Sequence, residues 1–275
     1  PAGRRPLSSG RTLGLRAGDP ALLEKRYEDG LRELDAALAE NPYFFEAREA
    51  RAQLLDLWTK DPLRALEDRR TLAAQLPLNL LARLGYAMSL AAVGRKEEAL
   101  AAARGIAAGG PDDLVSQFNA GVICLACDDR DSASRCAVRV LELADTQEEL
   151  EAGVELSVNS CLLVHDVSAA DEALERFAAR IDADFAHLMR AMVRREQGRH
   201  AEASRELRAI SPDDPYYLIC SDMRGWVEWT CGNLDLADKA SFDGARRFSE
   251  GGSFWVRGLI LMDLGRYPEA VENLD

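Results

Sequence analysis

Apolar residues recur at intervals of three and four along most of the chain, as in Leu31, Leu34, Ala37 and Leu38. This spacing places apolar side chains on one face of an α-helix. Each such face is too broad to be left in water, so neighbouring helices are expected to stack against one another. The pattern predicts a helix near residues 20–40, followed by helix pairs at about residues 46–78, 80–109, 114–143, 149–182, 184–210, 216–248 and 252–275.

A repeat of about 34 residues underlies these pairs. Four segments carry a Gly followed five residues later by Ala, and they begin at Gly94, Gly198, Gly232 and Gly265. Weaker copies begin at 128 and 165 without the Gly. The equivalent positions of all copies are 30, 65, 99, 133, 170, 203, 237 and 270, with spacings of 33 to 37 residues. Each copy is predicted to be a tight turn followed by the start of a helix.

Two further positions recur in phase with this turn. A small residue stands seven residues before it, at Ala87, Gly121, Ala191, Gly225 and Gly258. A small side chain lets the partner helix approach closely at the crossing of a helical hairpin. Proline stands twelve residues after four of the equivalent positions given above, at Pro42, Pro77, Pro111 and Pro215. Proline ends the second helix of a pair because it lacks the amide hydrogen.

With these marks the sequence resembles the tetratricopeptide repeat family, and the best match is Gly258, Gly265, Tyr267 and Ala270. The resemblance implies an all-α fold, an α-α superhelix of about seven to eight helical hairpins over residues 19–275. The chain departs from the family pattern in two ways. Leu, Cys or Met mostly replace the family's aromatic residues in the first helix, and the fifth copy has neither the Gly nor the closing Pro. The fifth copy also has additional residues within Asp145–Glu151, a place where the array can bend locally.

The two ends of the sequence differ from the body. Residues 1–18 mix Pro, Gly, Ser and four Arg without a helical period, which predicts a flexible basic linker or arm. Asp275 falls inside an expected second helix, and a solenoid normally ends in a polar capping helix. We therefore expect the natural protein to continue past this residue. An uncapped end also makes self-association through the C-terminal hairpin an alternative.

The charge and the cysteines narrow the choice of partner and compartment. The chain carries 34 Lys and Arg against 47 Asp and Glu, a formal charge of -13. An acidic body argues against nucleic acid or an anionic membrane as the ligand. No apolar run is long enough to span a bilayer and no signal peptide is evident. Six cysteines lie within helical apolar patterns, which predicts buried reduced thiols and a cytoplasmic location.

The sequence offers little catalytic chemistry. Its three histidines, His165, His187 and His200, are scattered, and no phosphate loop, zinc signature or nucleophile elbow is present. The pair Cys124 and Cys127 has no second pair or His cluster to complete a metal site. We therefore expect a protein that is not an enzyme and binds no cofactor or metal.

The resemblance implies a concave groove lined by the first helix of each hairpin. The matching positions are mainly apolar and aromatic: Phe118, Val122, Phe185, Leu188, Met192, Ile219, Asp222, Trp226, Trp229 and Trp255. Three of the four Trp belong to this set, and Trp supplies much contact area at interfaces. The competing interpretation is that the same rings pack between helices. The Lys, Asn and Arg clamp by which some family members hold an acidic peptide end is mostly replaced by apolar residues.

These observations predict an interaction scaffold or adaptor that binds an apolar or basic peptide or helix of a partner protein. The main alternative is the non-catalytic repeat region of a larger enzyme or regulator, such as a kinase, a glycosyltransferase or a transcription regulator. The sequence does not identify the partner.

Overall fold

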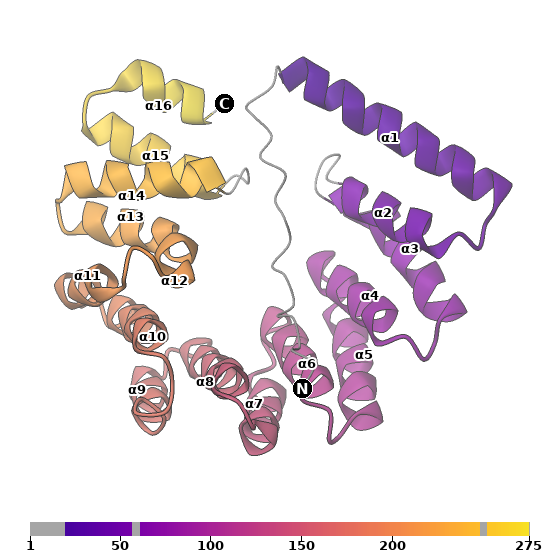
Figure 1. Cartoon of the computed structure of the whole chain (residues 1–275), viewed down its shortest axis with the longest axis horizontal. Coiled ribbons are helices and arrows are strands. Elements are labelled where there is room, and N and C mark those ends of the chain that lie inside the picture. Colours follow the sequence, from indigo (N-terminus) through magenta and orange to yellow (C-terminus); the bar gives the residue numbers. More distant parts are fainter. Residues whose placement is uncertain (1–19, 57–60, 248–251, 275) are drawn as a thin grey trace, which may run out of the picture. The chain divides into compact units, whose positions relative to one another are not determined.

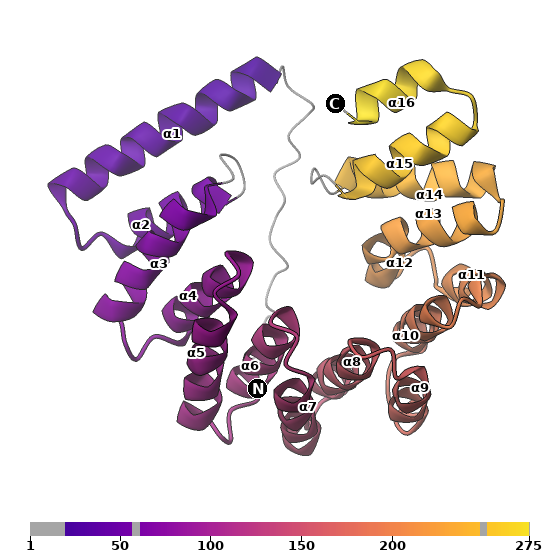
Figure 2. The same ribbon diagram turned by 180° about the vertical axis from the view of Figure 1, so that it is seen from behind.

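The computed structural model describes residues 20–56, 61–247 and 252–274, and the regular elements in these ranges are all helices (Figures 1 and 2). The predicted all-α class is confirmed. Residues 1–18, for which we expect a linker, lie outside the described residues. None of the described helices is long and apolar enough to cross a bilayer. The chain divides into two compact units, Pro1–Val93 and Gly94–Asp275.

The first unit holds four helices that pack in sequence order. They are α1 (Pro20–Glu40), α2 (Phe45–Leu54), α3 (Pro62–Gln75) and α4 (Leu80–Ala92). Ala52, Leu55 and Ala65 form a small buried cluster between α2 and α3. Asp68 is 3% exposed and accepts hydrogen bonds from Arg48 and Arg51, which ties α3 to α2 through a buried carboxylate.

The second unit holds twelve helices in its described part. They are α5 (Lys96–Gly109), α6 (Leu114–Ala126), α7 (Arg130–Leu143), α8 (Gln147–Leu162), α9 (Val167–Glu175), α10 (Ala183–Glu196), α11 (His200–Ala209), α12 (Pro215–Ile219), α13 (Ser221–Thr230), α14 (Leu234–Arg247), α15 (Gly252–Asp263) and α16 (Tyr267–Leu274). The bounds agree closely with the helix pairs predicted from the repeat.

The hairpins of this unit stack in two rows. The first helices α6, α8 and α10 contact one another in order, α12 lies between α10 and α13, and α13 contacts α15. Each first helix pairs with the helix that follows it, so that α7, α9 and α11 form a second row beside α6, α8 and α10 (Figure 1). We call the surface of the first row that is turned away from the second row the inner face.

The turns and the small positions behave as the sequence predicts. All six turns adopt left-handed backbone, including Asp128 and His165, with φ values between 56° and 78°. A Cβ atom added at Gly121 would overlap Leu156 of α8 and would lie 3.0 Å from the Cβ of Cys136 on α7. The absence of a side chain at 121 therefore sets the close approach of three helices.

The additional residues of the fifth copy lengthen α8, which begins at Gln147 and has 16 residues where α6 has 13. One local feature was not predicted. The first helix expected from residue 216 is broken at Cys220 into α12 and α13. The break turns α12 toward α10, and this changes the inner face.

Candidate partner-binding surface

The inner face of α6 is an apolar stripe. Its partly exposed residues include Val115, Phe118 and Val122, spaced by three and four, whereas Ala120 and Cys124 on the opposite side are buried. Val115 is 50% exposed. Phe118 and Val122, two of the predicted groove residues, are half-buried on this stripe. They therefore present apolar surface to solvent while remaining anchored in the helix row.

The next first helix, α8, adds acidic charge to this surface. α6 contains no charged residue, and every charged residue of α8 is acidic. Glu155 on α8 is exposed, and no Lys, Arg or His among the described residues forms an ion pair with it. The surrounding helices desolvate its carboxyl, and this raises the pKa of Glu155. The face formed by α6 and α8 thus combines an apolar stripe with an unpaired acid.

The inner side of α10 is covered, which corrects part of the sequence prediction. Phe185 and Leu188 are only 2% and 8% exposed, so they belong to the core and do not line a groove. The reason is α12: the ring of Tyr216 lies 5.5 Å from that of Phe185, and its hydroxyl donates to Glu151 Oε2 of α8 at 3.3 Å. Met192 remains half-buried against the same cluster. Sequence reasoning missed Tyr216 because its contacts are distant in sequence.

The C-terminal part of the inner face carries the tryptophans. Trp226 is half-buried and meets the ring of His200 edge-on at 5.2 Å. Trp229 is half-buried, and its Nε1 donates to Asp263 Oδ2 of α15 at 2.7 Å. Both interpretations of these rings therefore hold in part, since each ring packs on one side and is accessible on the other. The side chain of Trp255 lies outside the described residues.

Smaller apolar and acidic residues extend this part of the surface. Ile219 at the end of α12 is 54% exposed, and Met262 of α15 is 43% exposed. Asp222 of α13 is half-buried. Met262 was not among the predicted residues, although it occupies the position of Trp229 one repeat later.

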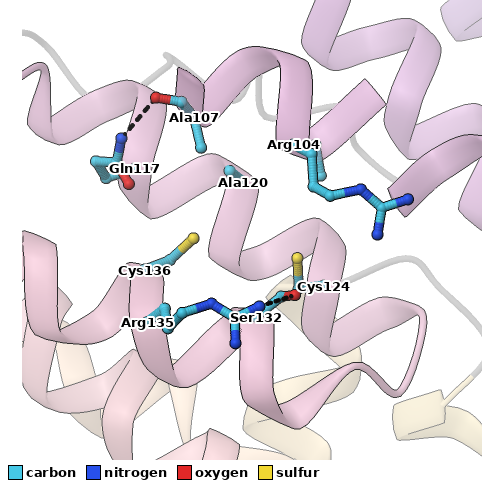
Figure 3. A pocket seen from close by; sticks show the side chains of 9 residues that line it. Arg104, Ala107, Gln117, Ala120, Cys124, Ser132, Arg135 and Cys136 are labelled. Atoms are coloured by element: carbon cyan, nitrogen blue, oxygen red, sulfur yellow. Dashed lines mark hydrogen bonds between the residues drawn. The ribbon is translucent and has the colours of Figure 1, made fainter. Parts of the chain in front are cut away.

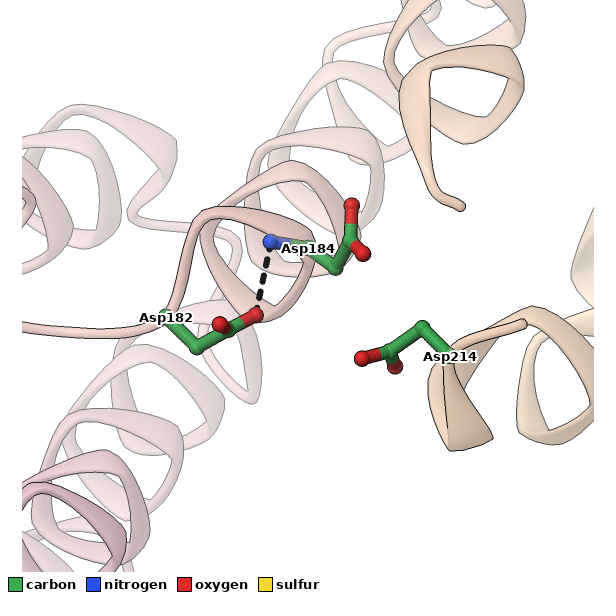
Figure 4. A group of neighbouring side chains, drawn as sticks. All are labelled: Asp182, Asp184 and Asp214. Atoms are coloured by element: carbon green, nitrogen blue, oxygen red, sulfur yellow. Dashed lines mark hydrogen bonds between the residues drawn. The ribbon is translucent and has the colours of Figure 1, made fainter. Parts of the chain in front are cut away.

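A group of three carboxylates, Asp182, Asp184 and Asp214, lies where α12 meets α10, with ligand atoms within 4.8 Å of one another (Figure 4). Each carboxylate accepts a hydrogen bond from backbone. Asp182 caps α10 at the amides of residues 184 and 185, and Asp214 caps α12 at the amide of Tyr216 at 2.7 Å. Asp184 accepts from the amide of Ser211 at 3.2 Å. Capping explains the positions of Asp182 and Asp214, and the bond from Ser211 explains that of Asp184.

Known structures resemble this stack of hairpins. The crystal structure of the APC/C hetero-tetramer Cut9-Hcn1 aligns over 92% of this chain and 49% of that chain, with a TM-score of 0.53 and 12% identity. PilW, a widely conserved type IV pilus biogenesis factor, aligns over 70% of this chain and 90% of its own, with a TM-score of 0.50 and 14% identity. A tetratricopeptide repeat protein from Parabacteroides merdae aligns over 83% and 90%, with a TM-score of 0.49 and 16% identity.

This chain has the tetratricopeptide repeat fold. No family model and no curated protein sequence matches it. At identities of 12 to 16%, the structural likeness describes the fold of the chain and leaves its function open.

Within the tetratricopeptide fold, the six cysteines are free, four of them buried and two, Cys161 and Cys231, half-buried. Cys124 and Cys136 are buried between α6 and α7, and burial raises the pKa of Cys124 to about 12. Both thiols are therefore protonated at neutral pH and are weak nucleophiles. They line a pocket on the side of α6 opposite the inner face (Figure 3).

Proposed function

We propose that this chain is a non-catalytic interaction module whose inner face binds a segment of a partner protein that is both apolar and basic. The tetratricopeptide fold supports an interaction role, because a stack of hairpins offers an extended surface rather than an enclosed site. The segment would contact Phe118 and Val122 at one end. At the other end it would contact a C-terminal patch made of Met192, Ile219, Asp222, Trp226 and Trp229, and Trp255 stays a sequence-based prediction for the same surface.

The observation that carries the proposal is the unpaired carboxylate of Glu155. An acid whose pKa is raised by desolvation gains when a cation approaches, because the cation favours its charged form. α6 and α8 contain no Lys or Arg, so a cation that pairs with Glu155 would come from outside these two helices. A Lys or Arg of the ligand, flanked by apolar side chains, fits Glu155 beside the stripe of α6.

The half-buried tryptophans support the apolar part of the proposal. Trp226 and Trp229 are held by His200 and Asp263, so little side-chain entropy is lost when a ligand packs on their accessible sides. Aromatic anchors of this kind often dominate binding energy at interfaces.

A synthetic helical peptide of about 18 residues with Leu on one face and Lys on the other tests the proposal. We expect it to bind more tightly than its Leu and Glu counterpart in fluorescence anisotropy. Glu155→Gln should weaken binding about fivefold, whereas Glu172→Gln on exposed α9 removes the same charge and should change little. Equal losses in the two variants would mean that only the net charge of the chain attracts the peptide.

The same variants can be used with a natural partner. Affinity capture from the source cells should recover a protein with the parent chain and lose it with a folded Trp226→Ala, Trp229→Ala variant. Self-association through α15 and α16 stays a prediction, as does the cytoplasmic location. Tyr267 and Val271 of α16 are 63% and 56% exposed, and sedimentation over a range of concentrations would detect a dimer.

A further inference from the structure

A pocket lies between α5 and α7, with α6 as its floor (Figure 3). Its volume is about 190 Å³, and it is partly open to solvent, whereas an engineered cavity of about 150 Å³ that holds benzene is closed. Small buried side chains line it: Ala120 and Cys124 on the floor, Ala103 on the α5 wall and Cys136 on the α7 wall. The pocket is therefore a lined space of small-molecule size, separated from the inner face by the thickness of α6.

The repeat register explains why the space is present. Residues around α5, α6 and α7 correspond to residues numbered 104 higher around α11, α13 and α14, since Gly121 matches Gly225 and Asp128 matches Gly232. In this register Ala103 matches Leu207, which is completely buried. A leucine fills the later repeat where an alanine leaves room in the earlier one.

The later repeat also contains a carboxylate at this place. Glu228 matches Cys124 and is 1% exposed. Its Oε1 accepts from Arg208 Nε and its Oε2 from Arg208 Nη2, both at 2.7 Å. Ser204 and Asn233 complete its hydrogen bonds at 2.9 and 2.8 Å. The chain itself thus shows a two-pronged guanidinium holding a carboxylate in this position of the repeat.

The earlier repeat keeps the arginine and lacks the carboxylate. Arg104 matches Arg208, lines the pocket and has no acidic partner within ion-pair distance among the described residues. Arg135 lines the other side and donates to Ser132 Oγ at 2.8 Å. Asp129, which matches Asn233, caps α7 at the amide of Ser132 and offsets one of the two positive charges. One guanidinium charge remains for a ligand.

We propose that this pocket binds a small ionised carboxylic acid with an apolar body about the size of a benzene ring. Its carboxylate takes the place of the Glu228 carboxylate and pairs with Arg104, while its body rests on Ala103, Ala120 and the two thiols. The acid is either a free metabolite or the C-terminal residue of a protein, because both offer the same chemistry.

Benzoate is the probe, and ligand-observed NMR on the full chain measures its binding. We expect benzoate to bind and benzyl alcohol, its neutral analogue, to bind at least about tenfold more weakly. Arg104→Ala should weaken benzoate by about tenfold or more. Arg205→Ala removes an exposed arginine of α11 outside the pocket and should leave the affinity unchanged.

Three variants copy the later repeat and test the proposed placement. Ala103→Leu fills the space and Cys124→Glu supplies an internal carboxylate, so each should abolish benzoate binding. Asp129→Asn should tighten it several-fold, since it removes a nearby negative charge and Asn caps a helix as well as Asp does. Far-ultraviolet circular dichroism shows whether each variant is folded, and Asp129→Asn tests the site by a gain that misfolding does not produce.

Short peptides ending in Phe distinguish the two sources. If the peptide with a free C-terminal carboxylate competes with benzoate and the same peptide with an amidated C-terminus does not, the ligand class is a protein C-terminus. If only benzoate binds, the ligand is a free acid. The proposal is overturned if neither probe binds at millimolar concentration, or if Arg104→Ala and Arg205→Ala bind benzoate equally.

Discussion

Glu228 is the most heavily bonded buried acid of the second unit, and replacing it should cost more stability than replacing any surface acid. Its carboxylate is 1% exposed and accepts four hydrogen bonds, from Ser204, Arg208 and Asn233. These bonds join α11, α13 and the turn before α14. Removing one partner of a buried ion pair typically costs about 3–5 kcal/mol.

The expected loss lies at the lower end of that range. The side chain of Arg208 is 49% exposed, so water can rehydrate its guanidinium once the carboxylate is gone. We expect Glu228→Ala to lower the free energy of unfolding by about 3 kcal/mol. Glu228→Gln should cost about 2 kcal/mol, because its amide nitrogen would face the donors of Arg208 or Asn233.

Urea unfolding followed by circular dichroism measures these values. Glu202→Gln is the matched control, because Glu202 pairs with Arg199 only on the helix surface, and its loss should stay within about 0.5 kcal/mol. At about 2–4 °C per kcal/mol, Glu228→Ala should lower the melting temperature by about 6–12 °C. A loss equal to that of the control would refute the assignment of Glu228 as a structural hub.

The same residue predicts a pH dependence. Burial alone would raise the pKa of Glu228, but the hydrogen bonds from Arg208, Asn233 and Ser204 outweigh it and hold the pKa below its usual value. A lowered pKa in the folded state stabilises the protein above the unfolded pKa of about 4.3 and is lost as the pH falls below it. The stability difference between the parent chain and Glu228→Gln should therefore be largest near neutral pH and shrink below about pH 4.

Four further substitutions test the fold, each by urea unfolding. His165→Gly should stabilise the chain by about 0.5–1 kcal/mol, because residue 165 has a left-handed φ of 56° that glycine adopts more readily. Gly198→Ala should destabilise the chain by about 1 kcal/mol through backbone strain alone, because no atom lies within 4 Å of the added carbon. Gly121→Val should cost more than about 2 kcal/mol because its side chain overlaps Leu156. Asp68→Ala should cost about 3 kcal/mol in the first unit, because the half-buried Arg48 and Arg51 lose their shared carboxylate, although Arg51 keeps its pair with Asp35.

The sequence was enough to predict what repeats and what depends on local backbone. The period placed the turns correctly even at Asp128 and His165, where there is no glycine, because an alanine of the repeat, Ala133 or Ala170, follows five residues later. The small residue at Gly121 likewise pointed to the close crossing that the structure contains. These features depend on positions within one hairpin, so the pattern of one chain reveals them.

What the sequence did not predict depends on contacts between repeats. The repeat pattern correctly predicted a helix start near residue 216, but nothing near Cys220 indicates that the helix breaks there. Only the packing of Tyr216 on Phe185, and its hydrogen bond to Glu151 in another repeat, explains why α12 covers α10. Two of the predicted groove residues, Phe185 and Leu188, were misplaced for this reason. The role of Arg104 was missed in the same way. That it lacks a carboxylate partner becomes clear only when it is compared with Arg208, which pairs with Glu228 in the later repeat.

The two proposed sites occupy opposite sides of one helix and should act independently. Phe118 and Val122 lie on the inner stripe of α6, whereas Ala120 and Cys124 on its other side line the pocket. A ligand at one site need not displace a ligand at the other, because α6 separates the two sites. Coupling between them would require an element with two alternative conformations that both ligands influence. Saturating benzoate should therefore leave the affinity of the Leu and Lys peptide unchanged, and Glu155→Gln should leave that of benzoate unchanged. Competition between the two probes would show that the basic peptide and the carboxylate share one site, which is incompatible with placing them on opposite sides of α6.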